Sequence, residues 1–395
     1  MPASMPSETS LSHALKLLEK IPLVDGHNDL PWIIHTHAKA RMDLAKYDLA
    51  QNHPETDTDI PRLLAGRVSA QWWAAFVPTL AEKPGRATLE LLDIIGQLPD
   101  HYPKVFLRAI NSKDIARAKR LKKIASFMTV EGGVGLENSL SPLRIWYAAG
   151  VRLMTLCHNE TLDWVDSATD APRHDGLTKF GEAVVLELNR LGIIVDLAHT
   201  APSVMNRVLD ISRAPVLFSH NNALALCDHP RNIPDTVLDR VRAKRSLIMA
   251  TFVPDFISQP ARDWARPLKD QYGKSSFLED HSAAVAAHVK AKGPQPRATI
   301  SELCNHIEYL VQKTGLDHIA IGSDYFGGTT PEGLEDVSKF PNLIAVLVER
   351  GWADASIAKI ASANFIRMFR SVERTARALQ QTEMPRTGRI EEYDR

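Results

Sequence analysis

The chain has 395 residues, 44% hydrophobic and 24% charged, which is ordinary for a globular protein and excludes long disorder, collagen and coiled coil. Its 47 basic and 47 acidic residues balance, so its charge favours neither nucleic acid nor an acidic membrane surface as a partner. Three widely spaced cysteines argue against a disulfide scaffold. Because no signal peptide and no apolar run of about 18 residues is evident, we expect a soluble cytoplasmic protein.

Eight short apolar runs follow one another along the chain and are typical of buried strands. Between most of them lie amphipathic patterns that predict helices, such as residues 177–192, which end at a glycine. Strand followed by helix, eight times, predicts a (β/α)8 (TIM) barrel, an α/β fold with its active site at the C-terminal rim of the strands. The runs are IPLVDGHND, QWWAAFVP, IASFMTVEGG, VRLMTLCHN, GIIVDLAHT, APVLFSH, SLIMATFV and HIAIGSDY.

We expect residues 1–395 to form a single barrel domain, with its core over about 20–375 and a polar C-terminal tail over 376–395. Three stretches rich in proline, glycine or charged residues are predicted to be loops, namely 39–62, 257–276 and 290–298. The pair Trp72 and Trp73 is expected to pack in the core or in a pocket wall.

Six of the eight runs end in an ionisable residue. Each of these alone could be a hydrogen-bonded core residue or a loop cap. Their convergence at one rim favours a functional site, because burying such groups together is costly unless they are paired or hold a metal. The six are Asp29, Glu131, His158, His199, His220 and Asp324.

The residue types at these strand ends indicate a metal site. His27 and Asp29 lie two apart on one strand, so both side chains can reach the same ion. Glu131 precedes two glycines and can bridge two cations, and His199 and His220 would complete a second site with it. Imidazole and carboxylate suit zinc, and also iron, cobalt or manganese.

The other candidates suggest substrate and proton chemistry. His158 can be a ligand or can donate to a developing oxyanion, and Asp324 is expected to transfer the proton of the attacking water. Arg231, in the loop after the His220 strand, suits a bidentate grip on a substrate carboxylate. Asp196 has the opposite side-chain parity to His199, so we expect it to play a supporting role. Five histidines in predicted loops are not expected to touch substrate: His35, His37, His53, His174 and His229.

These residues lie in stretches that resemble the membrane (renal) dipeptidase family, the M19 metallopeptidases. The resemblance implies a dipeptidase with two Zn²⁺ per chain bridged by Glu131. One zinc would be held by His27, Asp29 and Glu131, and the other by Glu131, His199 and His220. The stretches run in family order and include DGHNDLPW at 25–32, VEGG at 130–133, TLCHN at 155–159, RAPVLFSHNNA at 213–223, RNIPD at 231–235 and IGSD at 321–324.

The resemblance also implies roles toward the substrate. His158 would contact the scissile carbonyl, Arg231 the C-terminal carboxylate and Asp324 the catalytic water. Phe326 stands where the family often has a second acid, and Val134 where some members have histidine, so these departures bear on substrate preference and not on the ligands. The chain looks like a soluble bacterial-type member, expected to be a homodimer and to tolerate a D-residue at the C-terminal position of the dipeptide.

Two rival functions stay open at this stage. A related metal-dependent amidohydrolase could act on another small carboxylate-bearing amide or lactam, as a β-lactam hydrolase, lactonase or deaminase does. A non-catalytic binding protein could have kept the same fold, although intact residues at all five expected ligand positions argue against it.

Overall fold

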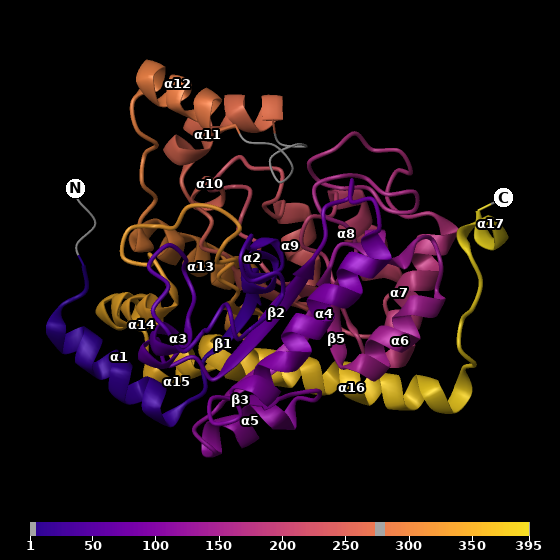
Figure 1. The fold of residues 1–395 in the computed structure, drawn as a ribbon, viewed down its shortest axis with the longest axis horizontal. Coiled ribbons are helices and arrows are strands. Elements are labelled where there is room, and N and C mark those ends of the chain that lie inside the picture. Colours follow the sequence, from indigo (N-terminus) through magenta and orange to yellow (C-terminus); the bar gives the residue numbers. More distant parts are fainter. Residues whose placement is uncertain (1–4, 273–280, 395) are drawn as a thin grey trace.

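The computed structural model describes residues 5–272 and 281–394, and its centre is a nearly closed barrel of parallel strands (Figure 1). The strands pair in the order β1-β2-β4-β5-β6-β7-β8-β9, and these eight coincide with the eight apolar runs, so the predicted barrel is confirmed. A short β3 pairs with the beginning of β4. The strands are β1 (Val24–Asn28), β2 (Ala70–Phe76), β3 (Phe106–Arg108), β4 (Ile124–Glu131), β5 (Val151–Thr155), β6 (Ile194–Asp196), β7 (Leu217–Phe218), β8 (Leu247–Ala250) and β9 (Ile319–Ile321).

Helices surround the barrel (Figure 1). The α-helices are α1 (Glu8–Lys20), α2 (Leu30–Thr36), α3 (Ile60–Ala65), α4 (Pro84–His101), α5 (Lys113–Arg120), α6 (Ser141–Ala149), α7 (Lys179–Leu191), α8 (Pro202–Ile211), α9 (Asp235–Val241), α10 (Pro254–Ile257), α11 (Gln259–Tyr272), α12 (Ser282–Lys292), α13 (Ile300–Thr314), α14 (Phe340–Glu349), α15 (Asp354–Ala358), α16 (Asn364–Thr382) and α17 (Ile390–Tyr393). Short 3-10 segments are η1 (Gly133–Leu136), η2 (Leu316–His318) and η3 (Val337–Lys339), and a π-helical turn, η4 (Lys359–Ala363), precedes α16.

The barrel closes between β1 and the end of β9. The backbone N–H of Asp324 donates to the carbonyl of His27 at 3.2 Å, and that of Asp29 donates to the carbonyl of Tyr325 at 3.2 Å. The last strand therefore delivers Asp324 next to His27, as its position in a closed barrel predicts.

Aromatic packing closes the amino-terminal end of the barrel. Trp72 is fully buried and stacks on Phe127 at a centroid distance of 4.2 Å. Phe365 and Phe369 of α16 pack edge-on against Trp72, at 5.1 and 5.6 Å. In Figure 1 α16 runs along the bottom of the barrel, while α11 and α12 lie at the opposite end. The prediction of a packing role for Trp72 and Trp73 is confirmed, since both are 0% exposed.

The predicted loop over 257–276 is wrong, because α11 occupies most of it despite Pro267 inside the helix. Three α11 side chains at helical spacing, Ala261, Arg262 and Ala265, are buried, so tertiary contacts outweigh the local helix-breaking signal. Residues 273–276 lie outside the described part of the chain. The predicted loop over 39–62 is mostly turns, and α3 begins at Ile60.

The last helix and the tail dock against the barrel. Helix α16 continues to Thr382, beyond the tail boundary expected at 376. Beyond it, Leu140 N–H donates to the carbonyl of Gly388 at 3.1 Å and Phe180 N–H donates to Asp394 Oδ1 at 3.1 Å. Among the described residues no helix combines the length and apolar character needed to cross a membrane.

Candidate metal centre

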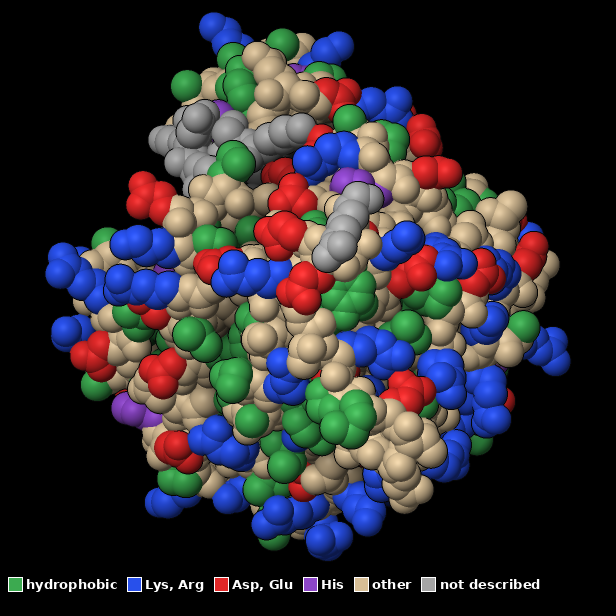
Figure 2. All heavy atoms as spheres, turned by 90° about the vertical axis from the view of Figure 1, so that its right-hand side faces the viewer, with side chains coloured by type: hydrophobic (Ala, Val, Ile, Leu, Met, Phe, Trp, Pro, Cys, Tyr) green, Lys and Arg blue, Asp and Glu red, His purple; other side chains and the backbone are tan. Residues whose placement is uncertain are grey.

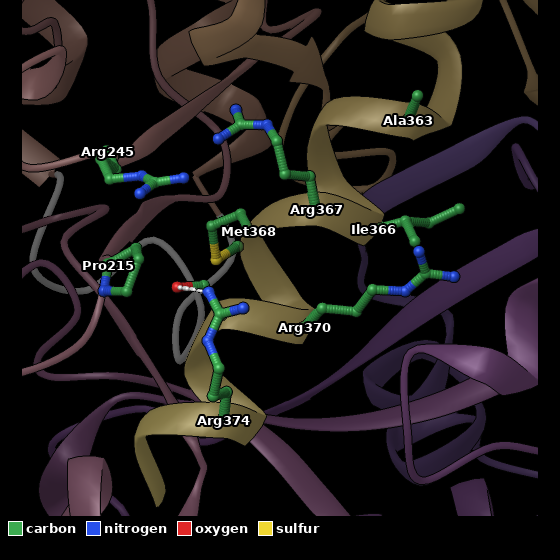
Figure 3. A pocket seen from close by; sticks show the side chains of 9 residues that line it. Pro215, Arg245, Ala363, Ile366, Arg367, Met368, Arg370 and Arg374 are labelled. Atoms are coloured by element: carbon green, nitrogen blue, oxygen red, sulfur yellow. Dashed lines mark hydrogen bonds between the residues drawn. The ribbon is translucent and has the colours of Figure 1, made fainter.

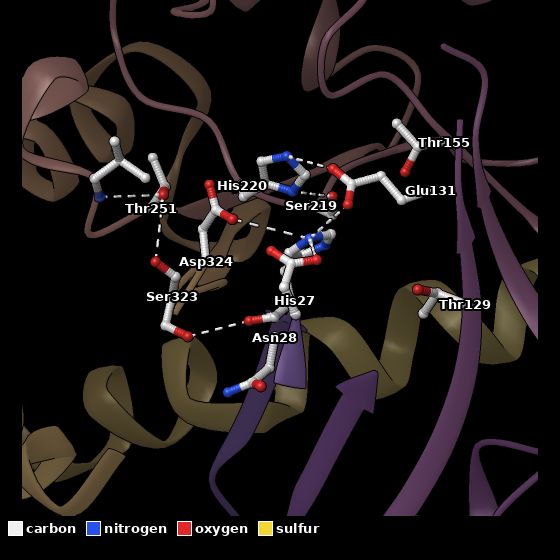
Figure 4. A network of polar contacts seen from close by, with 12 residues as sticks. His27, Asn28, Thr129, Glu131, Thr155, Ser219, His220, Thr251, Ser323 and Asp324 are labelled. Carbon is white, nitrogen blue, oxygen red and sulfur yellow. Dashed lines mark hydrogen bonds and ion pairs between the residues drawn. The ribbon is translucent and has the colours of Figure 1, made fainter. Parts of the chain in front are cut away.

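Glu131 lies at the centre of the barrel mouth, where strand ends bring ionisable side chains together (Figure 4). Its Oε2 lies 3.2 Å from His27 Nε2, whereas its Oε1 lies 3.0 Å from His199 Nε2 and 3.6 Å from His220 Nε2. The two carboxylate oxygens thus face different imidazoles. This is the arrangement that a carboxylate shared by two cations requires.

Three further side chains surround this group. His27 Nε2 lies 3.4 Å from Asp29 Oδ1 and 3.9 Å from Asp324 Oδ1. His158 Nε2 lies 3.9 Å from Glu131 Oε1. Three groups of three residues each have potential ligand atoms within 4.8 Å of one another. These groups combine the residues differently from the two ligand sets that the family resemblance implies. The groups are His27 with Glu131 and His220, Glu131 with His158 and His199, and His27 with Asp29 and Asp324.

Several of these ligand atoms are buried without a hydrogen bond. Both ring nitrogens of His27, Oδ1 of Asp29 and Nε2 of His220 have no hydrogen-bond partner among the described residues. Leaving buried polar atoms unpaired is costly, and native proteins rarely do so. Imidazole nitrogens and carboxylate oxygens form the donor set that binds Zn²⁺, so the residues fit a zinc centre.

The protonation states of the histidines suit metal binding. Burial, assisted by the Arg231 guanidinium, lowers the pKa of His158 to about 3. Burial, again with help from Arg231, holds the pKa of His199 and His220 well below its usual value. Burial also acts to lower the pKa of His27, but nearby carboxylates led by Glu131 outweigh it and raise the pKa. Three of the four imidazoles are therefore neutral at neutral pH, the form that binds a cation.

A hydrogen-bond chain behind His220 sets its tautomer. Asp196 Oδ2 accepts from Thr155 Oγ1 at 2.6 Å and from Ser219 Oγ at 2.7 Å. Because the Ser219 hydroxyl proton points to Asp196, Nδ1 of His220, 2.8 Å from the same oxygen, is the donor in that contact. The lone pair on His220 Nε2 is then directed at the cluster. Asp196 has the supporting position that its strand parity predicts.

A second chain supports the His27 side of the cluster. Asp25 accepts from Ser323 N–H at 2.7 Å, from Ser323 Oγ at 2.8 Å and from Gln71 Nε2 at 2.8 Å. It thereby ties β1 to the residue before Asp324. His199 and Asp324 both adopt left-handed backbone, with φ of 69° and 64°. Such conformations cost of order 1–3 kcal/mol in non-glycine residues and concentrate at functional sites.

Arg231 lies beside the cluster, in a cavity of about 790 Å³ that also contains Glu131, His158 and Asp324. Its side chain is 4% exposed, and Nε and Nη2 have no partner among the described residues. Burial lowers its pKa to about 10, with Asp324 opposing the shift, so it stays cationic. A buried guanidinium with unpaired N–H groups is a ready site for a carboxylate.

Apart from Asp196, the supporting residues and most of the cavity wall were not predicted from the sequence. Asp25, Ser219 and Ser323 each lie within two positions of a predicted site residue, and that proximity was the available signal. His229, expected to lie away from substrate, lines the cavity. So do residues for which the sequence predicted no role in the site, including Trp32, Phe76, Asn159, Phe256, Arg262, Trp264 and Lys269.

Comparison with known proteins gives consistent matches. The model of the membrane dipeptidase family, peptidase family M19, matches residues 11–383. Dipeptidase verJ of Clonostachys rogersoniana is 34% identical over 389 residues, which is 95% of this chain and 90% of the relative. The crystal structure of the probable dipeptidase PvdM from Pseudomonas aeruginosa superposes with a TM-score of 0.79 at 26% identity, covering 93% of this chain and 99% of PvdM. A metallopeptidase from Rhodobacter sphaeroides shares the fold, with a TM-score of 0.72 at 20% identity over 89% of this chain and 99% of the other.

Proposed function

Since this chain belongs to the membrane dipeptidase family, peptidase family M19, and is therefore a metal-dependent dipeptidase, we propose that it works with two Zn²⁺ ions shared by Glu131. The proposed ligands are those implied by the resemblance: His27, Asp29 and Glu131 for one ion, and Glu131, His199 and His220 for the other. Bound zinc would lower the pKa of the attacking water and stabilise the charge that develops on the carbonyl oxygen.

The observation that carries this proposal is the orientation of the Glu131 carboxylate. One oxygen faces His27 at 3.2 Å and the other faces His199 at 3.0 Å. Both imidazoles are almost fully buried and contribute atoms with no hydrogen-bond partner among the described residues. A single ion beside one oxygen would leave the ligands around the other oxygen unpaired.

The remaining residues bind the substrate and move the proton. Arg231 pairs with the free C-terminal carboxylate of a dipeptide, which limits the substrate to one residue beyond the cleaved bond. His158, neutral because of its burial, donates a hydrogen bond at the scissile carbonyl. Asp324 takes the proton of the attacking water and returns it to the leaving amine.

We also propose that a D-residue is accepted at the C-terminal position. The N-terminal residue of the substrate must lie near the buried carboxylates, where inverting its Cα would push a substituent into the packed barrel. The C-terminal residue is held through its carboxylate at Arg231, and the 790 Å³ cavity leaves room on either side of its Cα. The Rhodobacter sphaeroides metallopeptidase was solved with a phosphinate mimic of L-Ala-D-Ala, which makes that dipeptide the natural test substrate.

Elemental analysis of the fully active protein tests the two-zinc centre. We expect about two Zn²⁺ per chain, loss of activity on chelation and recovery on adding zinc. Glu131→Gln should lower the metal content at both positions, because the amide offers one acceptor oxygen in place of two. Full activity with a single tightly bound ion would contradict the shared centre.

A substrate panel separates the dipeptidase from the alternative amidohydrolase. Dipeptides should be turned over, whereas β-lactams, lactones and deaminase substrates should not; the reverse pattern would favour the alternative. The homodimer and the cytoplasmic location expected from the sequence stay predictions.

A further inference from the structure

A second cavity, of about 460 Å³, lies at the amino-terminal end of the barrel, away from the candidate metal centre (Figure 3). It is formed by one side of α16 and by the residues just before β7 and β8. Its lining is strongly basic: Arg245, Arg367, Arg370 and Arg374, with Ser371 and the apolar side chains of Pro215, Ile366 and Met368. Figure 3 shows three of the guanidinium groups turned inward, while that of Arg370 projects past Ile366.

These charges are not neutralised by carboxylates. Within the described ranges, the side chains of Arg245 and Arg370 have no hydrogen-bond or ion-pair partner, and the Arg374 side chain donates only to Ser371 Oγ, at 3.4 Å. Arg367 donates to the backbone carbonyl of Asp317, and its Nε is buried with no partner. The Asp317 carboxylate is itself paired with Lys359 at 2.8 Å.

Two of the arginines, Arg245 and Arg367, lie close enough to repel one another. Burial lowers the pKa of Arg367 and the nearby Arg245 lowers it further, although Asp317 opposes both. Arg245 is held in left-handed backbone, with φ of 54°. Positive charges placed close together repel one another, and a bound anion would relieve this repulsion.

The basic surface extends beyond this cavity. A neighbouring cavity of about 280 Å³ shares Pro215, Arg245 and Ser371 and adds Lys244, for which the described residues provide no ion-pair partner. Figure 2 shows Lys and Arg side chains gathered over the lower part of one face, at the end of the molecule where α16 lies in Figure 1.

We propose that the α16 cavity binds a small phosphate-bearing molecule, with its phosphate among Arg245, Arg367 and Arg374 and an apolar group against the partly buried Ile366. Arginine presents planar forks of donors that match phosphate oxygens, which lysine cannot do. The Ser371 hydroxyl lies beside Arg374 and adds a further donor. A volume of 460 Å³ falls within the range of small-molecule sites, and the zero net charge of the chain disfavours a nucleic acid.

Calorimetric titration of the zinc-loaded protein at low salt tests this site, with phenyl phosphate, inorganic phosphate and phenyl glucoside as probes. We expect phenyl phosphate to bind one per chain, inorganic phosphate to bind more weakly and the uncharged glucoside not to bind. Arg245→Gln and Arg374→Gln should each weaken phenyl phosphate roughly tenfold. Arg377→Gln is the matched control, because this exposed arginine lies on the same helix outside the cavity and its loss should change nothing.

Four results would overturn the proposal. One is no saturable phosphate binding. Another is an equal loss in Arg377→Gln, which would mean a diffuse charge effect. The third is binding that disappears in Arg231→Ala but persists in Arg245→Gln, which would place the anion at the metal centre. An oligonucleotide that binds more tightly as its length grows would likewise contradict a small-molecule site. Thermal melting of each variant verifies folding.

Discussion

Arg231→Ala should reduce kcat/KM for dipeptides far more than for dipeptide amides. Arg231 is 4% exposed, and its Nε and Nη2 have no partner among the described residues, so a substrate carboxylate would pair with it away from water. Losing one partner of such a buried charged pair costs about 2–5 kcal/mol. That corresponds to about a 30-fold to several-thousand-fold loss in kcat/KM for the free acid. The amide has no carboxylate to lose, so its already low rate should change little.

Arg262→Ala is the matched control for this experiment. Arg262 is also largely buried and lines the same cavity, but its Nε already donates to the backbone carbonyl of Asp228 at 2.9 Å. Its removal should affect acid and amide substrates alike. Steady-state kinetics of L-Ala-L-Ala and its amide on both variants give the answer. Equal losses for acid and amide in Arg231→Ala would refute the carboxylate contact and make Arg231 structural.

Three further predictions follow from named contacts. Asp324→Asn should keep the metal content but lower kcat by about 10²–10⁴-fold, because an amide cannot accept the proton, and near-normal kcat would assign that role elsewhere. L-Ala-D-Ala should be hydrolysed and D-Ala-L-Ala should not. Measured kcat/KM values for the two dipeptides test this, and equal inertness of both would contradict it. Burial lowers the pKa of His306 to about 4, so the unfolded chain takes up this proton first as pH falls. The free energy of unfolding therefore carries the full contribution of the neutral His306 above about pH 6.5 and loses it progressively between pH 6.5 and pH 4. At pH 5 the loss is about 2 kcal/mol. Urea unfolding of wild type and His306→Gln should show this extra loss in the wild type only.

The barrel strands and the candidate residues at their ends could be predicted because both follow from local sequence pattern. A fully buried parallel strand is a short apolar run, and eight such runs marked the eight barrel strands. The residue that ends each run was then the candidate, which is how Glu131 and His220 were found. The (β/α)8 topology itself brings those ends together at one rim.

Local sequence pattern could not predict the segments whose structure depends on contacts with residues far away in the chain. Proline and charge in 257–276 predicted a loop, yet burial of Ala261 and Ala265 against the molecule stabilises α11 there. The tail docks in part because Gly388 and Asp394 accept hydrogen bonds from backbone N–H groups more than 200 residues earlier in the chain.

The amino-acid sequence by itself determined the order of the barrel strands, the types of the candidate metal ligands and the rim of the barrel on which those candidates lie. Only the tertiary structure decided which side chains meet at this rim. One oxygen of Glu131 faces His27 and the other faces His199, and the contact with Ser219 orients the His220 ring. The tertiary structure also decided that the arginines around α16 surround one cavity. The physical reason is that strand periodicity sets the face on which a side chain emerges, whereas its neighbours there come from elements far away in the chain.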